Sequence, residues 1–396
     1  MNNIFALITL GDFGGKGFPR KRVREGILAP AAIAVLIAGF AFASDEPNKA
    51  TPDSWPMFRG DVQLTGVSPA SLPNELKVTW KFTREEAFTA AAAIMDGVVY
   101  VGCDDEHFYA LDLKDGKERW SFKAGGPVQS APTIIGDLVV FGDDPGTVFA
   151  LERTDGSEKW RFATKGQVIS SATPAGDRLV VGSYDGTIYC LKIADGSLLW
   201  SRETESKIHA TPALAGDKVL VSGCDARLHV LSLADGSSVR EIPLGSVAGS
   251  SAVVRGDTCF VGTYGSDVRG LNWEKGDTLW SYKDADREFP YLASAALAGD
   301  RIIIGGRDKR LRALSLADGK ELWLLNTKGR IDSSAVIVGD RAFVGSGDGK
   351  LYAVRVDTGA VVWSFEAGEG ISASPAVASG RLVIGTLDGV LYCFAE

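Results

Sequence analysis

The chain has 396 residues, 45% of them hydrophobic and 23% charged, which is ample for a large core. Its formal net charge is −8, and the region after the N-terminus shows no basic stripe, so nucleic-acid binding is not expected. Long polar low-complexity tracts are also absent, which argues against extended disorder beyond the N-terminal region.

The N-terminus has the pattern of a targeting signal. A basic stretch at residues 21–24 precedes an apolar, alanine-rich run over residues 27–42, and residues 41–43 form a small-x-small cleavage site. We therefore predict a signal peptide over residues 1–43, export to the periplasm or cell envelope, and a leader over residues 44–75. An uncleaved anchor is the alternative, and membrane contact is expected only through it or through a partner. No cysteine follows the apolar run, so a lipid-anchored N-terminus is not supported.

The rest of the chain is built from repeats of about 40 residues. Tryptophan recurs every 40 residues, except that Arg240 replaces one tryptophan and one interval is 43 residues long. The tryptophans of this ladder are Trp80, Trp120, Trp160, Trp200, Trp280, Trp323 and Trp363. A second ladder has the same period and consists of Gly102, Gly142, Gly182, Ser222, Gly262, Gly305, Gly345 and Gly385. Ladders that share one period identify a repeat architecture.

Each repeat contains four short strand signals separated by tight turns. In one repeat we expect strands at residues 130–135, 138–141, 148–151 and 158–162. Gly and Asp occupy the turns because they tolerate positive φ. Four short strands in about 40 residues are typical of one propeller blade. The ladders therefore predict an all-β fold, an eight-bladed β-propeller of four-stranded blades over residues 76–396.

The two ends of the repeat region are complementary. It begins with a lone outer-type strand, residues 76–82, and ends after only three strands of a repeat. We predict that the N-terminal strand pairs with the last three strands and closes the ring, because closure removes exposed strand edges. An open or linear β-repeat is the alternative. Small residues at the equivalent site of every first strand also suit convergence on an axis, where bulky side chains would clash. They are Ala91, Ala131, Ser171, Thr211, Ser251, Ser294, Ser334 and Ser374.

A recurring motif ends most repeats. Asp-Gly-Lys-Glu-Arg-Trp at residues 115–120 returns as Asp-Gly-Ser-Glu-Lys-Trp at residues 155–160 and as Asp-Gly-Lys-Glu-Leu-Trp at residues 318–323. With the preceding Ala-Leu-Asp-Leu at residues 110–113, the motif resembles the repeat of the pyrroloquinoline-quinone (PQQ)-like β-propeller family. The segment Trp-Pro-Met-Phe-Arg-Gly at residues 55–60 also resembles the entry segment of PQQ-like repeat proteins.

The resemblance implies a structural role for the tryptophan ladder. In the family this tryptophan packs between neighbouring blades and locks them together, and the role carries over to the seven tryptophans named above. Arg240 departs from the pattern, so a weaker seam is expected at the fourth blade.

The family contains two kinds of member. PQQ-dependent alcohol and sugar dehydrogenases hold PQQ at the ring axis with Ca²⁺, using carboxylate and amide oxygen ligands, an aspartate base and often a vicinal disulfide. Other members are non-catalytic, such as the BamB-type factor of outer-membrane protein assembly. This chain has no adjacent cysteines, few asparagines and short loops apart from residues 283–292. The resemblance therefore favours a non-catalytic protein-binding scaffold without a cofactor. A PQQ- and Ca²⁺-dependent dehydrogenase, a PQQ or ligand sensor and a glycan-binding module are the alternatives, and enzymatic activity is left open.

A binding site is expected on the face where each outer strand connects to the next blade, because those loops surround the axial funnel. The three histidines and five cysteines form no catalytic or zinc motif, and the cysteines are expected to be buried free thiols. Mixed charges with a few aromatics on this face suit an envelope protein or peptide partner, bound by a monomer. The candidate binding residues are Gln129, His209, Arg287, Tyr291, Arg330, Asp332 and Glu369.

Overall fold

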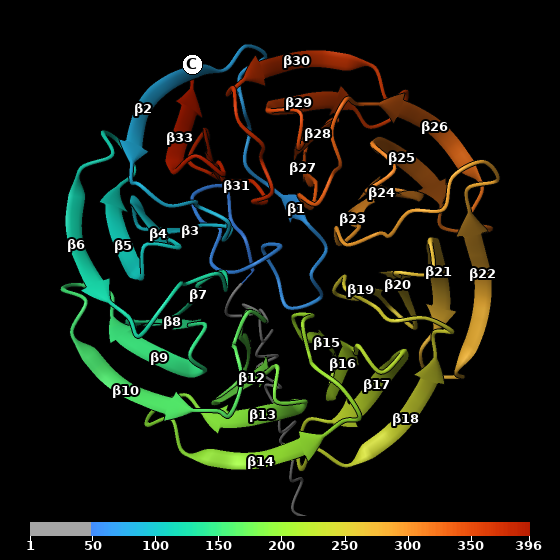
Figure 1. Cartoon of the computed structure of the whole chain (residues 1–396), viewed down its shortest axis with the longest axis horizontal. Coiled ribbons are helices and arrows are strands. Elements are labelled where there is room, and N and C mark those ends of the chain that lie inside the picture. The colour runs from blue at the N-terminus through green and yellow to red at the C-terminus, as the bar shows by residue number, and fades with distance from the viewer. Residues whose placement is uncertain (1–48) are drawn as a thin grey trace, which may run out of the picture. The chain divides into compact units, whose positions relative to one another are not determined.

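The computed structural model describes residues 49–396, so the predicted signal peptide lies outside the described residues. Every regular element in residues 49–396 is a β-strand, and this part of the chain contains no helix long and apolar enough to span a membrane. The strands form eight sheets around a central axis (Figure 1). The prediction of an all-β, eight-bladed propeller is therefore confirmed.

Blades 1 to 4 each consist of four consecutive antiparallel strands. Blade 1 contains β3 (Ala93–Met95), β4 (Val98–Gly102), β5 (His107–Asp112) and β6 (Glu118–Lys123). Blade 2 contains β7 (Thr133–Ile135), β8 (Leu138–Gly142), β9 (Thr147–Glu152) and β10 (Glu158–Ala163). Blade 3 contains β11 (Thr173–Ala175), β12 (Arg178–Gly182), β13 (Thr187–Lys192) and β14 (Leu198–Glu203). Blade 4 contains β15 (Ala213–Ala215), β16 (Lys218–Ser222), β17 (Arg227–Ser232) and β18 (Ser238–Pro243).

Blades 5 to 7 repeat this order, and blade 7 gains one short extra strand. Blade 5 contains β19 (Val253–Arg255), β20 (Thr258–Gly262), β21 (Asp267–Asn272) and β22 (Asp277–Lys283). Blade 6 contains β23 (Ala296–Ala298), β24 (Arg301–Gly306), β25 (Arg310–Ser315) and β26 (Glu321–Asn326). Blade 7 contains β27 (Val336–Val338), β28 (Arg341–Gly345), β29 (Lys350–Arg355) and β30 (Val361–Glu366), with β1 (Val67–Ser68) parallel to β27.

Blade 8 joins the two ends of the propeller. It contains β31 (Ala376–Ala378), β32 (Arg381–Gly385) and β33 (Val390–Ala395), and its outer strand is β2 (Lys77–Thr83). β2 pairs antiparallel with β33, with Trp80 opposite Cys393, and the two strands lie side by side in Figure 1. The predicted closure of the ring by the N-terminal strand is therefore confirmed.

The strands of blade 2 show how far the local pattern fixes the boundaries. The second, third and fourth strands begin and end within one residue of the expected positions. The first strand begins three residues late, at Thr133 rather than residue 130. The reason is that the preceding residues bond elsewhere: Ser130 Oγ donates to Gly142 O at 2.9 Å, and the N–H of Ala131 donates to Ser171 Oγ of blade 3 at 3.0 Å.

Tryptophans of the outer strands contact the next blade in a constant way. Trp200 Nε1 donates to Leu233 O of blade 4 at 2.9 Å, and its ring lies against Gly236. The same indole-to-carbonyl bond is made by Trp80, Trp120, Trp160, Trp280 and Trp323. Trp363 instead packs edge-on against Phe394, because blade 8 has the chain ends where other blades have a turn.

The seam after blade 4 differs because Arg240 stands at the tryptophan position. Arg240 is exposed and its side chain approaches Gly276 of blade 5. Blade 5 contributes Trp273, which is buried in one cluster with Ile242 and donates from Nε1 to Gly256 O at 2.9 Å. This seam therefore keeps a buried indole, supplied by the following blade.

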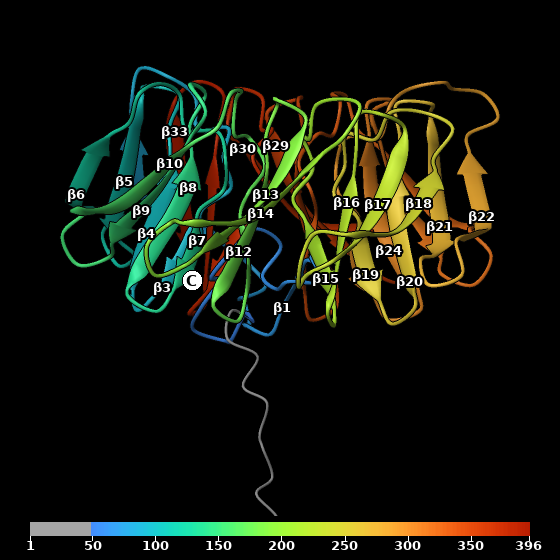
Figure 2. The same cartoon turned by 90° about the horizontal axis from the view of Figure 1, so that it is seen from below.

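The leader closes one end of the ring. Figure 2 shows it at the end opposite the long connection that follows β22. Its carbonyls accept the N–H of the middle residue of the first strand in six blades, namely Ile94, Ile134, Leu214, Val254, Leu297 and Ile337. In blade 3 this position is Pro174, which has no N–H to satisfy. The leader thus provides partners for backbone donors at the inner edge of the propeller.

Candidate functional site

The axis of the ring contains a cavity of about 220 Å³. All eight small residues at the equivalent site of the repeats line it, from Ala91 of blade 1 to Ser374 of blade 8. They lie in the segments that lead into the first strands, where the blades converge. We call these eight residues the lower tier.

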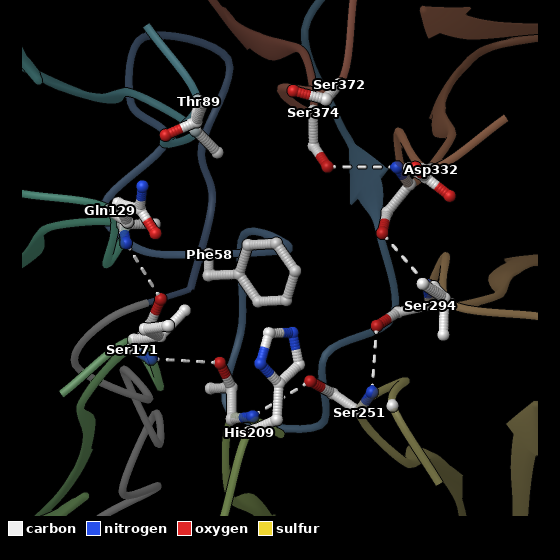
Figure 3. A pocket seen from close by; sticks show the side chains of 17 residues that line it. Phe58, Thr89, Gln129, Ser171, His209, Ser251, Ser294, Asp332, Ser372 and Ser374 are labelled. Atoms are coloured by element: carbon white, nitrogen blue, oxygen red, sulfur yellow. Dashed lines mark hydrogen bonds between the residues drawn. The ribbon is translucent and has the colours of Figure 1, made fainter. Parts of the chain in front are cut away.

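Hydroxyl groups of the lower tier join neighbouring blades into a belt (Figure 3). The N–H of Thr211 donates to Ser251 Oγ at 2.9 Å, and the N–H of Ser251 donates to Ser294 Oγ at 3.0 Å. Four more bonds of 2.9–3.1 Å repeat this contact around the ring. They join blade 2 to blade 3, blade 3 to blade 4, blade 6 to blade 7, and blade 7 to blade 8. The belt is open only on the side of Ala91 and Ala131, which have no hydroxyl.

A second set of residues, the upper tier, lines the cavity two positions earlier in each repeat. Its members are Thr89, Gln129, Ile169, His209, Gly249, Leu292, Asp332 and Ser372. Whereas the lower tier is small everywhere, the chemistry of the upper tier changes from blade to blade. Phe58 of the leader also lines the cavity, and its ring and the imidazole of His209 both point into it (Figure 3).

His209 is held by an aromatic partner. Its Nδ1 lies 2.7 Å from the hydroxyl of Tyr184, and the ammonium group of Lys207 lies 5.0 Å from the centre of the Tyr184 ring. Burial lowers the pKa of His209 below its ordinary value, so the imidazole is neutral at pH 7. Burial also raises the pKa of Tyr184 to about 12, so the phenol remains protonated.

Asp332, across the cavity, is neutralised by arginines. Arg307 donates to both of its carboxylate oxygens, at 2.8 and 3.1 Å, and Arg330 Nε lies 3.1 Å from Oδ2. Such bidentate pairs fix the geometry of both partners. Asp332 therefore contributes an ordered ion pair to the funnel, and not a free carboxylate.

Gln129 belongs to an acidic part of the mouth. Its Nε2 donates to Asp104 Oδ1 at 3.2 Å, and Thr89 Oγ1 donates to the same oxygen at 3.0 Å. Burial raises the pKa of Asp104, and repulsion from Asp144 of the next blade acts in the same direction. The mouth therefore has an acidic side at blades 1 and 2 and arginines at blade 6.

The structure does not bring all seven candidate residues into one site. Gln129, His209 and Asp332 line the axial cavity, and Arg330 contacts Asp332 from the rim. Glu369 is exposed on the connection after β30 and does not line the cavity. Arg287 lines a separate cleft over blade 6.

Tyr291, named as a candidate binding residue on the funnel face, instead lies inside the core. Its side chain is only 2% exposed and packs in one cluster with Phe260 and Trp280. Its hydroxyl accepts a bond of 2.7 Å from Nη1 of the fully buried Arg312. Because this bond satisfies the phenol inside the core, the ring needs no contact with solvent or ligand.

Sequence reasoning missed the residues that hold the upper tier. Asp104, Tyr184 and Arg307 each lie in the turn after the second strand of a blade and contact the upper-tier residue of the next blade. The sequence does contain a signal for them. Each stands two residues after a member of the second ladder, which runs from Gly102 to Gly385, as Tyr184 follows Gly182. Phe58 was missed because the leader lies outside the repeat pattern.

Comparison with known families identifies the chain at the level of the family. A family model described as "Outer membrane protein assembly factor BamB" matches four overlapping stretches, residues 73–207, 146–288, 209–330 and 307–396. The chain belongs to this family of PQQ-like repeat propellers. No curated protein matches the chain at a significant level.

Solved structures of both kinds of PQQ-like protein share the BamB-like fold of this chain. The crystal structure of BamB from Moraxella catarrhalis has a TM-score of 0.69 and 20% identity, covering 81% of this chain and 98% of that one. A europium-containing methanol dehydrogenase has a TM-score of 0.75 and 13% identity, covering 89% and 99%. The quinohemoprotein alcohol dehydrogenase from Comamonas testosteroni has a TM-score of 0.76 and 12% identity, covering 88% and 81%. At these identities the likeness shows the fold alone.

The residues around the axis do not fit the PQQ and Ca²⁺ that dehydrogenase members hold. Ca²⁺ takes about six to eight oxygen ligands, including carboxylates, whereas the carboxylate of Asp332 is bound by Arg307. Within residues 49–396 no three His, Cys, Asp or Glu side chains are grouped so as to hold a metal ion. The cavity of about 220 Å³ is also smaller than the roughly 300–1,000 Å³ typical of small-molecule sites.

Proposed function

We propose that the chain is an exported, non-catalytic scaffold whose funnel face binds another protein of the cell envelope. The observation that carries this proposal is the upper tier, a mixed polar and apolar surface that is ordered in advance by bonds between neighbouring blades. Ordering before binding lowers the entropic cost of association. Membership of a family described as an outer-membrane protein assembly factor supports a partner in the envelope.

The chemistry of the mouth suits binding better than reaction. A nucleophile or general base needs a partner that activates or orients it. In the described residues, His209 bonds to the phenol of Tyr184, while Asp332 is held by two arginines. His209 and Asp332, the two residues of the cavity lining that could act as acid or base, are thus each used to hold a neighbour. Mixed polar groups around an aromatic are characteristic of protein interfaces.

Photocrosslinking in the native envelope tests this proposal. A photoreactive amino acid replaces His209 or Arg330 at the mouth, and one at Asp217, in the turn after β15, serves as the control. We expect one protein of the same mass to be crosslinked from both mouth positions and not from Asp217. Crosslinks of equal yield from all three positions, or none from the mouth, would contradict the proposal.

The alternative of a cofactor-dependent protein is tested separately. The full-length protein is titrated with PQQ and Ca²⁺ in a calorimeter while the absorbance of PQQ is followed. Saturable binding with one cofactor per chain would overturn the cofactor-free scaffold and direct assays to alcohol and sugar oxidation. Heat and absorbance that change only by dilution are the expected result.

A further inference from the structure

A second cleft lies on the funnel face, beside the axial cavity. It owes its existence to the interval of 43 residues between Trp280 and Trp323, since the extra residues extend the connection from β22 to β23 (Figure 2). This connection, the turn that begins at residue 307 and the end of β26 with the connection after it surround a volume of about 870 Å³. We call this volume the blade 6 cleft.

The walls of the blade 6 cleft are basic, although the chain as a whole has a net charge of −8. Its basic side chains are Arg287, Arg307, Lys309, Arg310 and Lys328. Four basic residues lie within positions 307–312, a short cluster that the prediction of no basic stripe does not account for. This cluster follows the long connection in the sequence, and that arrangement is the feature from which a basic cleft could have been predicted.

Three of these cations lack a carboxylate partner. Arg307 is held by Asp332, and Arg310 Nη1 lies 2.5 Å from Asp284 Oδ2. Arg287, Lys309 and Lys328 are exposed and form no ion pair within residues 49–396. The carboxylate that lines the cleft, Asp308, is buried and accepts a bond of 2.6 Å from Arg312. The lining of the cleft therefore presents three cations to solvent that have no carboxylate partner.

A buried arginine holds the cleft in shape. Arg312 is fully buried, and its guanidinium donates to Asp284 at 3.0 Å and to the hydroxyl of Tyr291 at 2.7 Å. These two residues stand at the start and the end of the long connection, so one side chain fixes both of its ends. Between them, Arg287 donates to Asp308 O at 2.9 Å, and Phe289 is 48% exposed at the cleft. An exposed aromatic on an ordered connection is a ready contact for an apolar side chain.

We infer that the blade 6 cleft binds an extended acidic segment of the partner protein, with carboxylates against Lys309, Lys328 and Arg287. The inference rests on the proposed function and names the chemistry of its partner. The free cations stand on three separate chain segments, so they match charges distributed along a peptide better than one compact anion. Phe289 adds a place for one apolar side chain, which inorganic phosphate or a lipid headgroup would leave unused.

Two substitutions remove charge from the cleft without disturbing the fold. Lys309 has a φ of 67°, and four other blades have glycine at the same turn position, namely Gly146, Gly186, Gly349 and Gly389. Lys309→Gly therefore removes the cation and relieves the backbone. Lys328→Glu reverses a charge, and Lys165→Glu is its matched control. The backbone N–H of Lys328 donates to Asp348 at 2.9 Å, and that of Lys165 donates to Asp185 at the same distance. Lys165, however, lies outside the cleft.

Binding is measured by fluorescence anisotropy with the full-length protein and a labelled peptide of alternating Glu and Ser around one Leu. A peptide with Lys in place of Glu is the charge-reversed probe. We expect binding to weaken about tenfold with Lys328→Glu and about threefold with Lys309→Gly, from the loss of charge pairing. Lys165→Glu should leave the affinity unchanged. Binding should also weaken as salt rises, because the screening length shortens.

Several results would overturn the inference. They are no saturable binding of the Glu peptide, equal binding of the Lys peptide, or an equal loss with Lys165→Glu. Tighter binding of inorganic phosphate or of phosphatidylglycerol vesicles would replace the peptide by another anion. A partner crosslinked at His209 and Arg330 while the Glu peptide fails to bind would leave the proposed function standing and reject only the acidic segment. Binding of the Glu peptide without any partner crosslinked at His209 or Arg330 would reject the proposed scaffold and keep the preference of the cleft for acidic chains.

Discussion

The hydroxyl belt at the axis predicts how much one interblade bond stabilises the ring. Ser251→Ala removes the acceptor of the Thr211 N–H, a bond of 2.9 Å between residues that are only 5% and 4% exposed. Leaving a buried donor unsatisfied costs about 1–3 kcal/mol. Because water can enter the polar axial cavity and bond to the freed N–H, we expect the lower half of this range, about 1–2 kcal/mol.

The reverse substitution should stabilise the ring. Ala131→Ser places a hydroxyl where the belt is open, next to the N–H of Ala91, and one added bond is worth about 0.5–1.5 kcal/mol. Ser237→Ala is the control, because it removes only an exposed bond to Asp235 and should change stability by less than about 0.5 kcal/mol. Denaturant midpoints and calorimetric Tm values, with refolding checked, give all three changes. Equal midpoints for Ser251→Ala and Ser237→Ala would refute the view that the belt holds the blades together.

Three further predictions follow from local contacts. Gly236→Ala should destabilise by about 2–4 kcal/mol, because its φ is 71° and an added Cβ would lie 2.5 Å from the Trp200 ring; Gly216→Ala, with nothing near its Cβ, should lose only the backbone part, about 1 kcal/mol. A thiol reagent at pH 8 should label one cysteine in the native protein, the half-buried Cys224, and five after denaturation, because the other four are buried; labelling of two or more native thiols would contradict this. Since burial lowers the pKa of His209 below 6.5, the unfolded chain takes up its proton first, so stability should fall as the pH drops below 6.5. Denaturant midpoints between about pH 7.5 and 5 should fall less steeply for His209→Asn, and identical slopes would contradict the assignment.

The parts of this structure that could be predicted from sequence are those that occur eight times. The tryptophan ladder, the small residues at the axis and the complementary chain ends each follow from one repeated packing requirement, so chance departures in one blade do not hide the pattern. Arg240 shows the tolerance of the repeat: at this seam the next blade contributes a buried indole, Trp273, which no spacing rule reveals.

Features that occur once were harder to predict. Tyr291 looked like a surface residue because it stands in the longest connection, yet a bond to Arg312 keeps it inside the core. Its burial depends on Arg312, 21 positions away on β25, and no local periodicity records that contact. In the blade 6 cleft, the cluster at residues 307–310 is visible in the sequence, but only folding brings Arg287 and Lys328 to it.

The hydroxyl belt and the proposed binding surface occupy adjacent positions on the same segments of this chain. At the lower tier, backbone N–H groups donate to hydroxyls, so the contact does not depend on the side chain of the donating residue. At the upper tier, two residues away, the contacts run between side chains such as His209 and Tyr184 or Asp332 and Arg307. A substitution at the upper tier therefore changes the chemistry of the mouth and leaves the belt intact. In this chain the mouth can therefore change from blade to blade while the belt keeps neighbouring blades joined.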